Sequence, residues 1–537
     1  MTNRIYKTGA NREQLSLLPP RVEDYVGPDN PVRAIVAYVC ALDLAKLGFL
    51  HTEPGRGAGQ PSYDPADLLK AYLYGYLNRV RSSRRLEQEA QRNLELIWLL
   101  KGLTPGYHTI ADFRKNNWAA LKAANRDFVL LLRALDLVGG EVVAIDGAFF
   151  HGDASKASIK TRKRLTKQIA ALDRDIEDYR GALEANDASE ATRSPAGRDG
   201  GDGGGLADRT KELMAKRAEA AASLARLEES GETQLSTTDA DARLLSKRGQ
   251  VVAGFNVQTA VDAKHKLIVA SEVVNDGNDT GQLYEMAKAA KEALGVETLE
   301  ALADAGYYNG AALKNCEDGG IVAYVPPVKR TGLLDAQGRF SHEEFIYDAG
   351  ADAYRCPAGA LLVPTKSLKT KTGGRLEFRY MSRKATCRAC PLRTRCVDKS
   401  QKRTVYRWVH EEVLDRHRAR MKEAGTRMRQ RACLAEHPFG TLKCRAGYRH
   451  FLVRGFRKVR GEWSLMALCY NFARVLTILG VDGFIAYVAS RAAERAILFV
   501  LTAITTTMDR ATASMGRFCA GLAEISAIAR FRFSPAI

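Results

Sequence analysis

Two aspartates follow short apolar runs that lie far apart in the chain. Asp146 follows VVAI, and Asp304 follows LEALA. Such runs predict buried strands, so each carboxylate is expected at the end of a rigid element, where it faces solvent. An aspartate after a strand is also a common turn residue or helix cap, so neither position is informative alone. Together they fit two neighbouring strands of one sheet and predict a site for divalent cations.

Such a site is suited to displacement reactions at phosphorus. Two metal ions about 3.5–4 Å apart clamp the attacking and leaving oxygens of an in-line displacement. Converging carboxylates repel one another without cations, and a third carboxylate from a facing helix would complete the site. Because all the ligands are oxygens, the expected cofactor is Mg²⁺ or Mn²⁺.

Cysteines form a second candidate metal site. The Cys387-x-x-Cys390 spacing lets both sulfurs face one ion, and Cys356 and Cys396 would complete a tetrahedral structural Zn²⁺ site. The alternative is four unligated, reduced thiols. The other six cysteines are expected to be ordinary core residues.

The charge of the chain favours a polyanionic partner. The 537 residues include 81 Lys and Arg against 62 Asp and Glu, a net charge of +19. Nucleic acid is the commonest partner of so basic a protein, although a generic basic protein or a membrane-surface binder has the same composition. Residues 1–20 show no apolar signal segment, and the apolar run 496–508 is too short for a confident membrane span. A cytoplasmic protein without a membrane partner is therefore expected.

The elements that must position the two aspartates form an α/β core, expected within residues 139–479. The patterns predict five strands of one sheet, with helices after the third, fourth and fifth of them. The predicted strands cover residues 142–146, 251–261, 267–273, 299–303 and 321–325.

Two insertions interrupt this core. In residues 156–235, apolar residues repeat at alternating spacings of four and three on both sides of a glycine-rich linker, which predicts a coiled-coil hairpin. The hairpin could contact DNA, self-associate or serve only as a structural arm. The second insertion, residues 329–402, carries the four cysteines.

Residues 1–138 are predicted to form a helical DNA-binding domain. Asn30-Pro31 and Asp64-Pro65 predict two helix starts, and Thr109-x-x-Asp112 predicts a third. Arg84 and Arg85 belong to a basic cluster that is expected either to contact DNA or to form a solvated face. Residues 480–537 form a divergent C-terminal tail.

Several motifs together resemble the DDE transposases of bacterial insertion sequences, over roughly residues 15–475. The N-terminal motifs PDNPVRAIVAYV, YDPADLLKAYLYGYL and HTIADFRK resemble an InsH-like domain. The later motifs occur in the family's order and contain its catalytic positions: VVAIDGAFFHGDASK, GFNVQTAVD, ALADAGYYNG, AEHPFGTLK, HFLVRGFRKVRGE and SLMALCYNFARV.

The resemblance implies an RNase H-like catalytic core with a mixed five-stranded sheet. It implies that Asp146, Asp304 and Glu436 are the catalytic, metal-binding carboxylates. Glu462 is an alternative third carboxylate. Glu436 is preferred because Lys443 follows it by seven residues, about two helical turns, and would share its face and hold a phosphate.

Basic residues are expected to hold the DNA backbone, and interleaved aromatics, Tyr448, Phe451 and Phe456, to stack on a distorted DNA end. The alternative is an amphipathic segment with a solvated side. The expected DNA contacts are Lys443, Arg431, Arg449, Arg454, Lys458, Arg84 and Arg85.

The implied function is metal-dependent cleavage and strand transfer at the terminal inverted repeats of an insertion sequence. The expected partners are double-stranded DNA and a second copy of the chain, in the bacterial cytoplasm at the nucleoid. Two alternatives stay open: another RNase H-like nuclease, and a transposase-derived DNA-binding protein without catalysis.

Overall fold

The computed structural model describes residues 21–53, 61–191, 203–247, 249–327, 337–370, 375–397 and 400–491. The chain divides into two compact units, one of residues 1–124 and 469–537 and the other of residues 125–468. Several predictions fall on residues that the structure does not describe. They concern residues 1–20, most of the glycine-rich linker, the apolar run 496–508 and much of the C-terminal tail.

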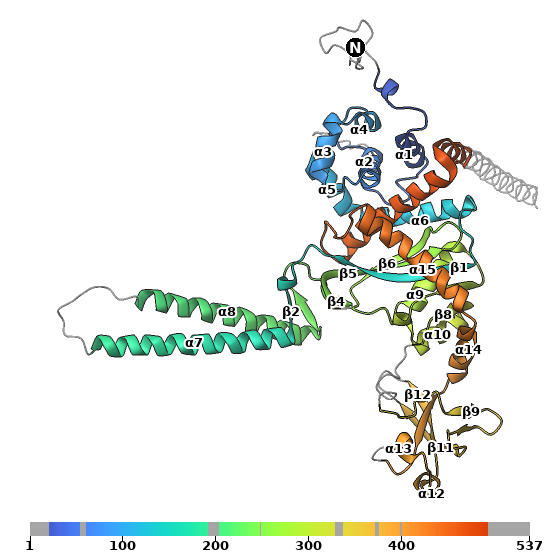
Figure 1. The fold of residues 1–537 in the computed structure, drawn as a ribbon. Helices are drawn as coiled ribbons and strands as arrows, with labels where there is room; N and C mark the ends of the chain where they lie inside the picture. The colour runs from blue at the N-terminus through green and yellow to red at the C-terminus, as the bar shows by residue number, and fades with distance from the viewer. Residues whose placement is uncertain are drawn as a thin grey trace, which may run out of the picture. The chain divides into compact units, whose positions relative to one another are not determined.

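The first unit is helical (Figure 1). Asn30 and Asp64 cap the two helices predicted to begin there, because their side chains accept hydrogen bonds from Val32 N at 3.0 Å and Ala66 N at 2.8 Å. The third predicted start is wrong, since Gly106, not Thr109, is the N-cap of α5. The helices are η1 (Val22–Tyr25), α1 (Pro31–Cys40), α2 (Pro65–Leu77), α3 (Ser83–Arg92), α4 (Leu94–Leu99) and α5 (Tyr107–Asn116), followed by α6 (Trp118–Ala134), which continues into the second unit.

The second unit is built on a mixed sheet of order β4-β5-β1-β7-β8, with β6 also paired to β5. Strand β1 is antiparallel to β5 and parallel to β7, and β7 is parallel to β8. The strands are β1 (Val142–His151), β4 (Arg243–Lys247), β5 (Gln250–Asp262), β6 (Ile268–Val274), β7 (Leu299–Leu302) and β8 (Ile321–Tyr324).

This sheet differs from the prediction in two respects. It has six strands rather than five, because the short β4 forms a hairpin with the first residues of β5. Strand β1 also does not end at Asp146: it continues to His151, since residues 147–151 pair with β5. The pairing of β1 with β7 stops at Ala144, so Asp146 lies where β1 extends beyond β7.

Helices flank the sheet. Helix α9 (Leu283–Leu294) packs against β6, α10 (Gly310–Asp318) against β8, and α15 (Gly425–Phe439) against β1. Three further elements adjoin these helices in the chain. The turn η3 (Ala305–Tyr307) precedes α10, the helix α14 (Glu411–Lys422) precedes α15, and the π-helical turn η4 (Gly440–Arg445) follows α15. Ala144, Leu434 and Ala435 form the buried contact between β1 and α15, which fixes that helix above the middle of the sheet.

The first insertion is a two-helix hairpin of α7 (Arg162–Ala191) and α8 (Gly203–Ser230). At its base, β2 (Ile159–Thr161) pairs with β3 (Gln234–Ser236), after the 3-10 turn η2 (Lys156–Ser158). The helices pack through the heptad positions, and Arg217 Nε pairs across them with Asp173 Oδ1 at 2.6 Å. The packed residues are Leu165, Ile169, Leu172, Ile176 and Tyr179 with Leu213, Ala220, Leu224 and Leu227.

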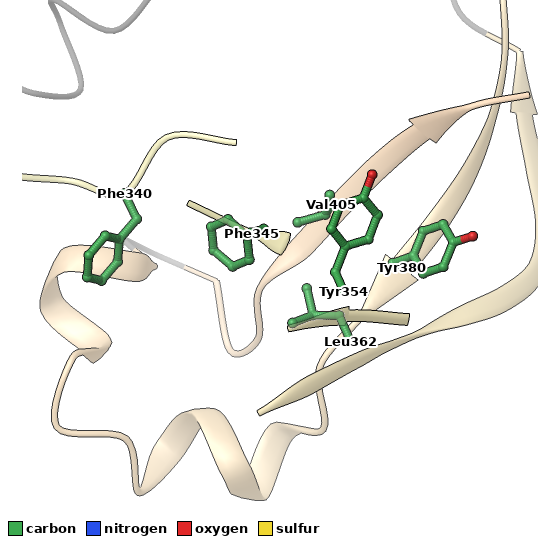
Figure 2. Packing of buried hydrophobic residues seen from close by; sticks show 6 residues of the cluster. All are labelled: Phe340, Phe345, Tyr354, Leu362, Tyr380 and Val405. Carbon is green, nitrogen blue, oxygen red and sulfur yellow. The ribbon is translucent and has the colours of Figure 1, made fainter. Parts of the chain in front are cut away.

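The second insertion folds around a five-stranded sheet that was not predicted, and this sheet extends past the predicted end at residue 402, because its last strand ends at Trp408. Figure 2 shows its core, made of Phe340, Phe345, Tyr354, Leu362, Tyr380 and Val405. The strands have the order β13-β12-β11-β10-β9, so this insertion has its own hydrophobic core. Its elements are β9 (Ile346–Asp348), β10 (Ala353–Arg355), β11 (Leu361–Thr370), β12 (Leu376–Met381), β13 (Thr404–Trp408), α12 (Lys384–Arg388) and α13 (Arg393–Cys396).

A long helix, Phe456–Arg491, follows η4 in the chain. Among the described residues it alone is long and apolar enough to cross a membrane, by length and composition. A single such helix is weak evidence, because core helices of soluble proteins pass the same test.

Candidate active site

Sheet register brings the two predicted aspartates together. Val142 lies opposite Glu300 and Ala144 opposite Leu302 in the parallel pair of β1 and β7. The same offset, continued for two residues, places Asp146 opposite Asp304. Asp304 begins the 3-10 turn η3, and its Oδ1 accepts a hydrogen bond from Gly306 N at 2.9 Å.

Arg431 on α15 lies against both carboxylates. Its Nη2 is 3.1 Å from Asp146 Oδ1 and 3.8 Å from Asp304 Oδ2. The contact between α15 and β1 holds the helix in place, because Ala435, one turn after Arg431, is fully buried. One guanidinium therefore neutralises part of the charge of two acidic side chains that belong to different strands.

A third acidic side chain, Asp279, belongs to the same surroundings. It is 6% exposed, and its Oδ1 accepts hydrogen bonds from Asn256 Nδ2 at 2.8 Å and Gln258 Nε2 at 2.7 Å. Lys247 Nζ lies 3.3 Å from its Oδ2. Asp279 is not the N-cap of the following helix α9, because that N-cap is Gln282. Asn256 and Gln258, two amide side chains within the buried part of β5, were the signal in the sequence for this network.

Gly147 leaves space for the network. A Cβ atom at this position would lie 2.3 Å from Gln258 Nε2 and 2.7 Å from Asp279 Oδ1. A side chain here would displace the hydrogen-bonded pair next to Asp146. The glycine after the first aspartate is therefore required by packing at the site.

Burial and charge shift the acidities at the site. Burial raises the pKa of Asp146 above its ordinary value, Arg431 opposes this rise, and Asp304 adds to it. Burial likewise raises the pKa of Tyr307 well above its usual range, and the three aspartates add to that rise. Tyr307 stays protonated and donates a hydrogen bond to Gln258 Oε1.

Glu436 and Glu462, the two candidates for the third carboxylate, have different environments. Glu436 lies on the exposed side of α15. Glu462 is fully buried, and its Oε2 accepts a hydrogen bond from Leu452 N at 2.8 Å. That contact gives Glu462 a structural role, whereas the Glu436 carboxylate is open to solvent.

Glu436 and Lys443 were expected on one face of a continuous α-helix, and this expectation is wrong. The α-helix ends at Phe439, and Gly440–Arg445 is a π-helical turn with more residues per turn. Lys443 instead points to β1: its Nζ donates a hydrogen bond to Phe149 O at 2.6 Å and lies 4.4 Å from the Phe150 ring centroid. Burial lowers the pKa of Lys443 to about 8.

Within the described ranges, no three His, Cys, Asp or Glu side chains are close enough to hold a metal ion in this conformation. The aspartates nevertheless fit a divalent cation, because they offer carboxylate oxygens to one shared positive group, the Arg431 guanidinium. Asp146 and Asp304 therefore face one cationic side chain, that of Arg431.

The remaining basic residues named above have mixed environments. Arg84 and Arg85 are exposed on α3. Arg449 and Arg454 are also exposed, and Arg454 Nε pairs with Asp153 Oδ2 at 2.8 Å, while Lys458 is partly buried. The segment 449–451 runs alongside the end of β1. Two backbone hydrogen bonds join them: His151 N donates to Arg449 O at 3.0 Å, and Phe451 N donates to His151 O at 2.8 Å.

The expected stacking aromatics are largely unavailable to DNA. Tyr448 and Phe451 are buried, at 3% and 1% exposure, and Phe451 packs against Phe150 and Phe255. This part of the prediction is wrong because these side chains fill the core beneath the basic segment.

The four cysteines of the second insertion line one cavity of about 180 Å³. Burial raises the pKa of the Cys396 thiol, Arg403 opposes the rise, and the nearby Cys387, Cys356 and Cys390 add to it. Of the other six cysteines, Cys316 and Cys469 are buried as expected, but Cys40, Cys433 and Cys444 are exposed, which contradicts the core assignment for these three. The sixth, Cys519, lies outside the described residues.

Two family models match separate parts of the chain. Residues 355–476 match a model described as Transposase DDE domain, and residues 20–116 match one described as Transposase domain (DUF772). Glu436 and Lys443 lie within the first match, whereas Asp146 and Asp304 lie outside both. Searches of curated proteins and of solved structures found no match. Together the two matches support an insertion-sequence DDE transposase.

Proposed function

We propose that this transposase uses divalent metal ions to cleave DNA at the terminal inverted repeats of an insertion sequence and to join the freed 3′ ends to target DNA. The observation that carries the proposal is the meeting of Asp146 and Asp304 around one cation at adjacent strands. The transposase family supports the general activity.

The sheet supports an RNase H-like catalytic core. Three antiparallel strands in the order β6-β5-β1 are followed by the parallel strands β7 and β8, and β1 lies at the centre. This arrangement places one carboxylate on the central strand and one directly after its parallel neighbour. The sequence resemblance implies this placement for the first two catalytic residues, Asp146 and Asp304.

We assign metal binding to Asp146 and Asp304, completed by Glu436. When bound, Mg²⁺ or Mn²⁺ supplies activation of the attacking hydroxyl and stabilisation of the leaving oxygen. The backbone N–H groups of Gly147 and Gly306 hold the two aspartates, at 2.9 Å each, and Tyr307 and Asp279 support the buried side of the site. We propose that Lys443, Arg449 and Arg454 neutralise DNA phosphates near the end of β1, where Lys443 would exchange its hydrogen bond to Phe149 O, and Arg454 its ion pair with Asp153, for a phosphate.

The proposed partners are double-stranded DNA and a second copy of the chain, one copy for each end of the element. Arg84 and Arg85 in the first unit and Lys458 in the second are further proposed DNA contacts. A mini-element bounded by the inverted repeats that flank the reading frame tests this function. Strand-transfer products would support it, cuts without joining would indicate another nuclease, and specific binding without cleavage would indicate a DNA-binding derivative.

A separate proposal is a structural Zn²⁺ site made by Cys356, Cys387, Cys390 and Cys396. All four line one cavity, although their sulfurs must move closer together to bind an ion. Purified protein should contain about one equivalent of zinc, as a four-thiolate site requires. Cys387→Ser should lower this content, and Cys433→Ser, at an exposed cysteine outside the cavity, should not. Protein without zinc would exclude the site.

The lowered pKa of Lys443 predicts that DNA binding depends on pH. Because burial lowers its pKa to about 8, raising the pH from 7 to 9 should remove its charge and one phosphate contact. Affinity for a short duplex should then fall, by up to about tenfold at pH 9, since one pKa unit corresponds to a tenfold change. Fluorescence anisotropy should show this loss in the wild type and in the control Lys458→Gln, but not in Lys443→Gln. An equal loss in Lys443→Gln would assign the titration to another group.

A further inference from the structure

We propose that Arg431 is an internal counter-ion of the catalytic site, which occupies the place of a metal ion until the metal displaces it. The inference rests on the proposed metal-dependent function. Its basis is the position of one guanidinium nitrogen, Nη2, within 3.1 Å of Asp146 Oδ1 and 3.8 Å of Asp304 Oδ2. A metal ion bound by the same two carboxylates would compete with this nitrogen for their oxygens.

Arg431 is enclosed but incompletely bonded. Its side chain is 14% exposed, and that of Asp146 is 16% exposed. Its Nε is buried and has no hydrogen-bond partner among the described residues. Arginine binds carboxylates most strongly through two parallel hydrogen bonds, whereas here a single nitrogen faces both aspartates. The guanidinium is therefore held mainly by charge, and a divalent ion offers more charge to the same oxygens.

Neighbouring cations have other contacts. Lys247 Nζ pairs with Asp279, and Lys443 Nζ donates to Phe149 O. Within the described part of the chain, the ion pairs that join Asp146 and Asp304 are both made by Arg431. Without Arg431, two acidic groups on adjacent strands would face each other with their mutual repulsion reduced only by more distant charges.

Displacement would also make Arg431 available to DNA. The residue lies on α15, the helix that presents the exposed Glu436. A guanidinium released from the aspartates can pair with a phosphate, so metal binding should strengthen DNA binding. By thermodynamic reciprocity, DNA should strengthen metal binding by the same factor. Arg431 would thus couple assembly of the site to the presence of its substrate.

Arg427 provides a matched control. It lies one helical turn before Arg431 on α15, and its Nη2 pairs with Glu300 Oε2 at 2.7 Å. Replacing Arg427 with glutamine removes the same charge from the same helix without uncovering Asp146 or Asp304. A general effect of net charge on metal binding would appear in both variants, whereas release of the two aspartates would appear only in Arg431→Gln.

The test is Mn²⁺ titration of the full chain without DNA, with free Mn²⁺ measured by electron paramagnetic resonance. Arg431→Gln should bind Mn²⁺ at least about fivefold more tightly than the wild type, the lower limit of typical coupling between linked sites. Arg427→Gln should bind as the wild type does, and Asp146→Asn should lose the binding. Arg431→Lys, which keeps a charge on a shorter side chain, should give an intermediate affinity and serves if the glutamine variant does not fold.

The outcomes separate the two proposals. Unchanged or weaker Mn²⁺ binding by Arg431→Gln, together with loss of binding in Asp146→Asn, would overturn the counter-ion and leave the metal site intact. Retained binding in Asp146→Asn would overturn the metal site and the counter-ion together. A short duplex provides a second measurement: Mn²⁺ should raise DNA affinity in the wild type and much less in Arg431→Gln, and equal gains would contradict the coupling.

Discussion

Replacing Asp146 or Asp304 with asparagine should abolish cleavage of terminal-repeat DNA while leaving DNA binding intact. Each change removes one charged metal ligand at the junction of β1 and β7 and preserves the volume of the side chain. Metal ions contribute several kcal/mol to transition-state stabilisation, so cleavage should fall by at least about 10³-fold. Cleavage of labelled mini-element ends in Mg²⁺ and in Mn²⁺ measures the loss, and gel shift measures binding.

Asp153→Asn is the matched control for this experiment. Asp153 follows β1, its side chain is 53% exposed, and it pairs with Arg454. This variant should keep most of its cleavage activity. Undiminished cleavage by Asp146→Asn or by Asp304→Asn would refute the assignment of that residue to the catalytic site.

The substitutions Glu436→Gln and Glu462→Gln should have opposite effects on activity and stability. Glu436 is exposed, so its replacement should change the free energy of unfolding by less than about 0.5 kcal/mol and reduce cleavage by about 10²-fold or more. Glu462 accepts a hydrogen bond from Leu452 N in the core. Loss of this charged acceptor should lower the free energy of unfolding by about 1.5–3 kcal/mol.

Urea unfolding and the mini-element assay measure the two effects separately. Glu423→Gln, at an exposed glutamate just before α15, controls for loss of negative charge near that helix. If Glu462→Gln abolished cleavage at unchanged stability while Glu436→Gln stayed active, the third carboxylate would be Glu462. Helix α15 would then carry Arg431 to the site without contributing an acidic ligand.

Local patterns in the sequence were sufficient to predict most strands of the six-stranded sheet. The run that precedes Asp146 is wholly buried and apolar, and the run that precedes Asp304 is apolar except for Glu300, so both strands can be predicted without knowledge of their partners. The heptad repeats of α7 and α8 could also be recognised in the sequence, because the contact positions of each helix recur at regular spacing along its own length. The second insertion gave no comparable signal: β9 and β10 have three residues each, too few to show alternation.

The site itself depended on contacts between distant residues. The sequence by itself was sufficient to select the two aspartates as candidates, to show the basic character of the chain and to predict the order of β1, β5, β6, β7 and β8, because these follow from residue type and local spacing. Only the tertiary structure decided that β1 extends beyond Asp146, that Glu462 is buried, and that the π-helical turn directs Lys443 to β1. It alone placed Arg431 between Asp146 and Asp304, because that contact requires α15 to pack across β1, and no local pattern encodes the partner of a helix face.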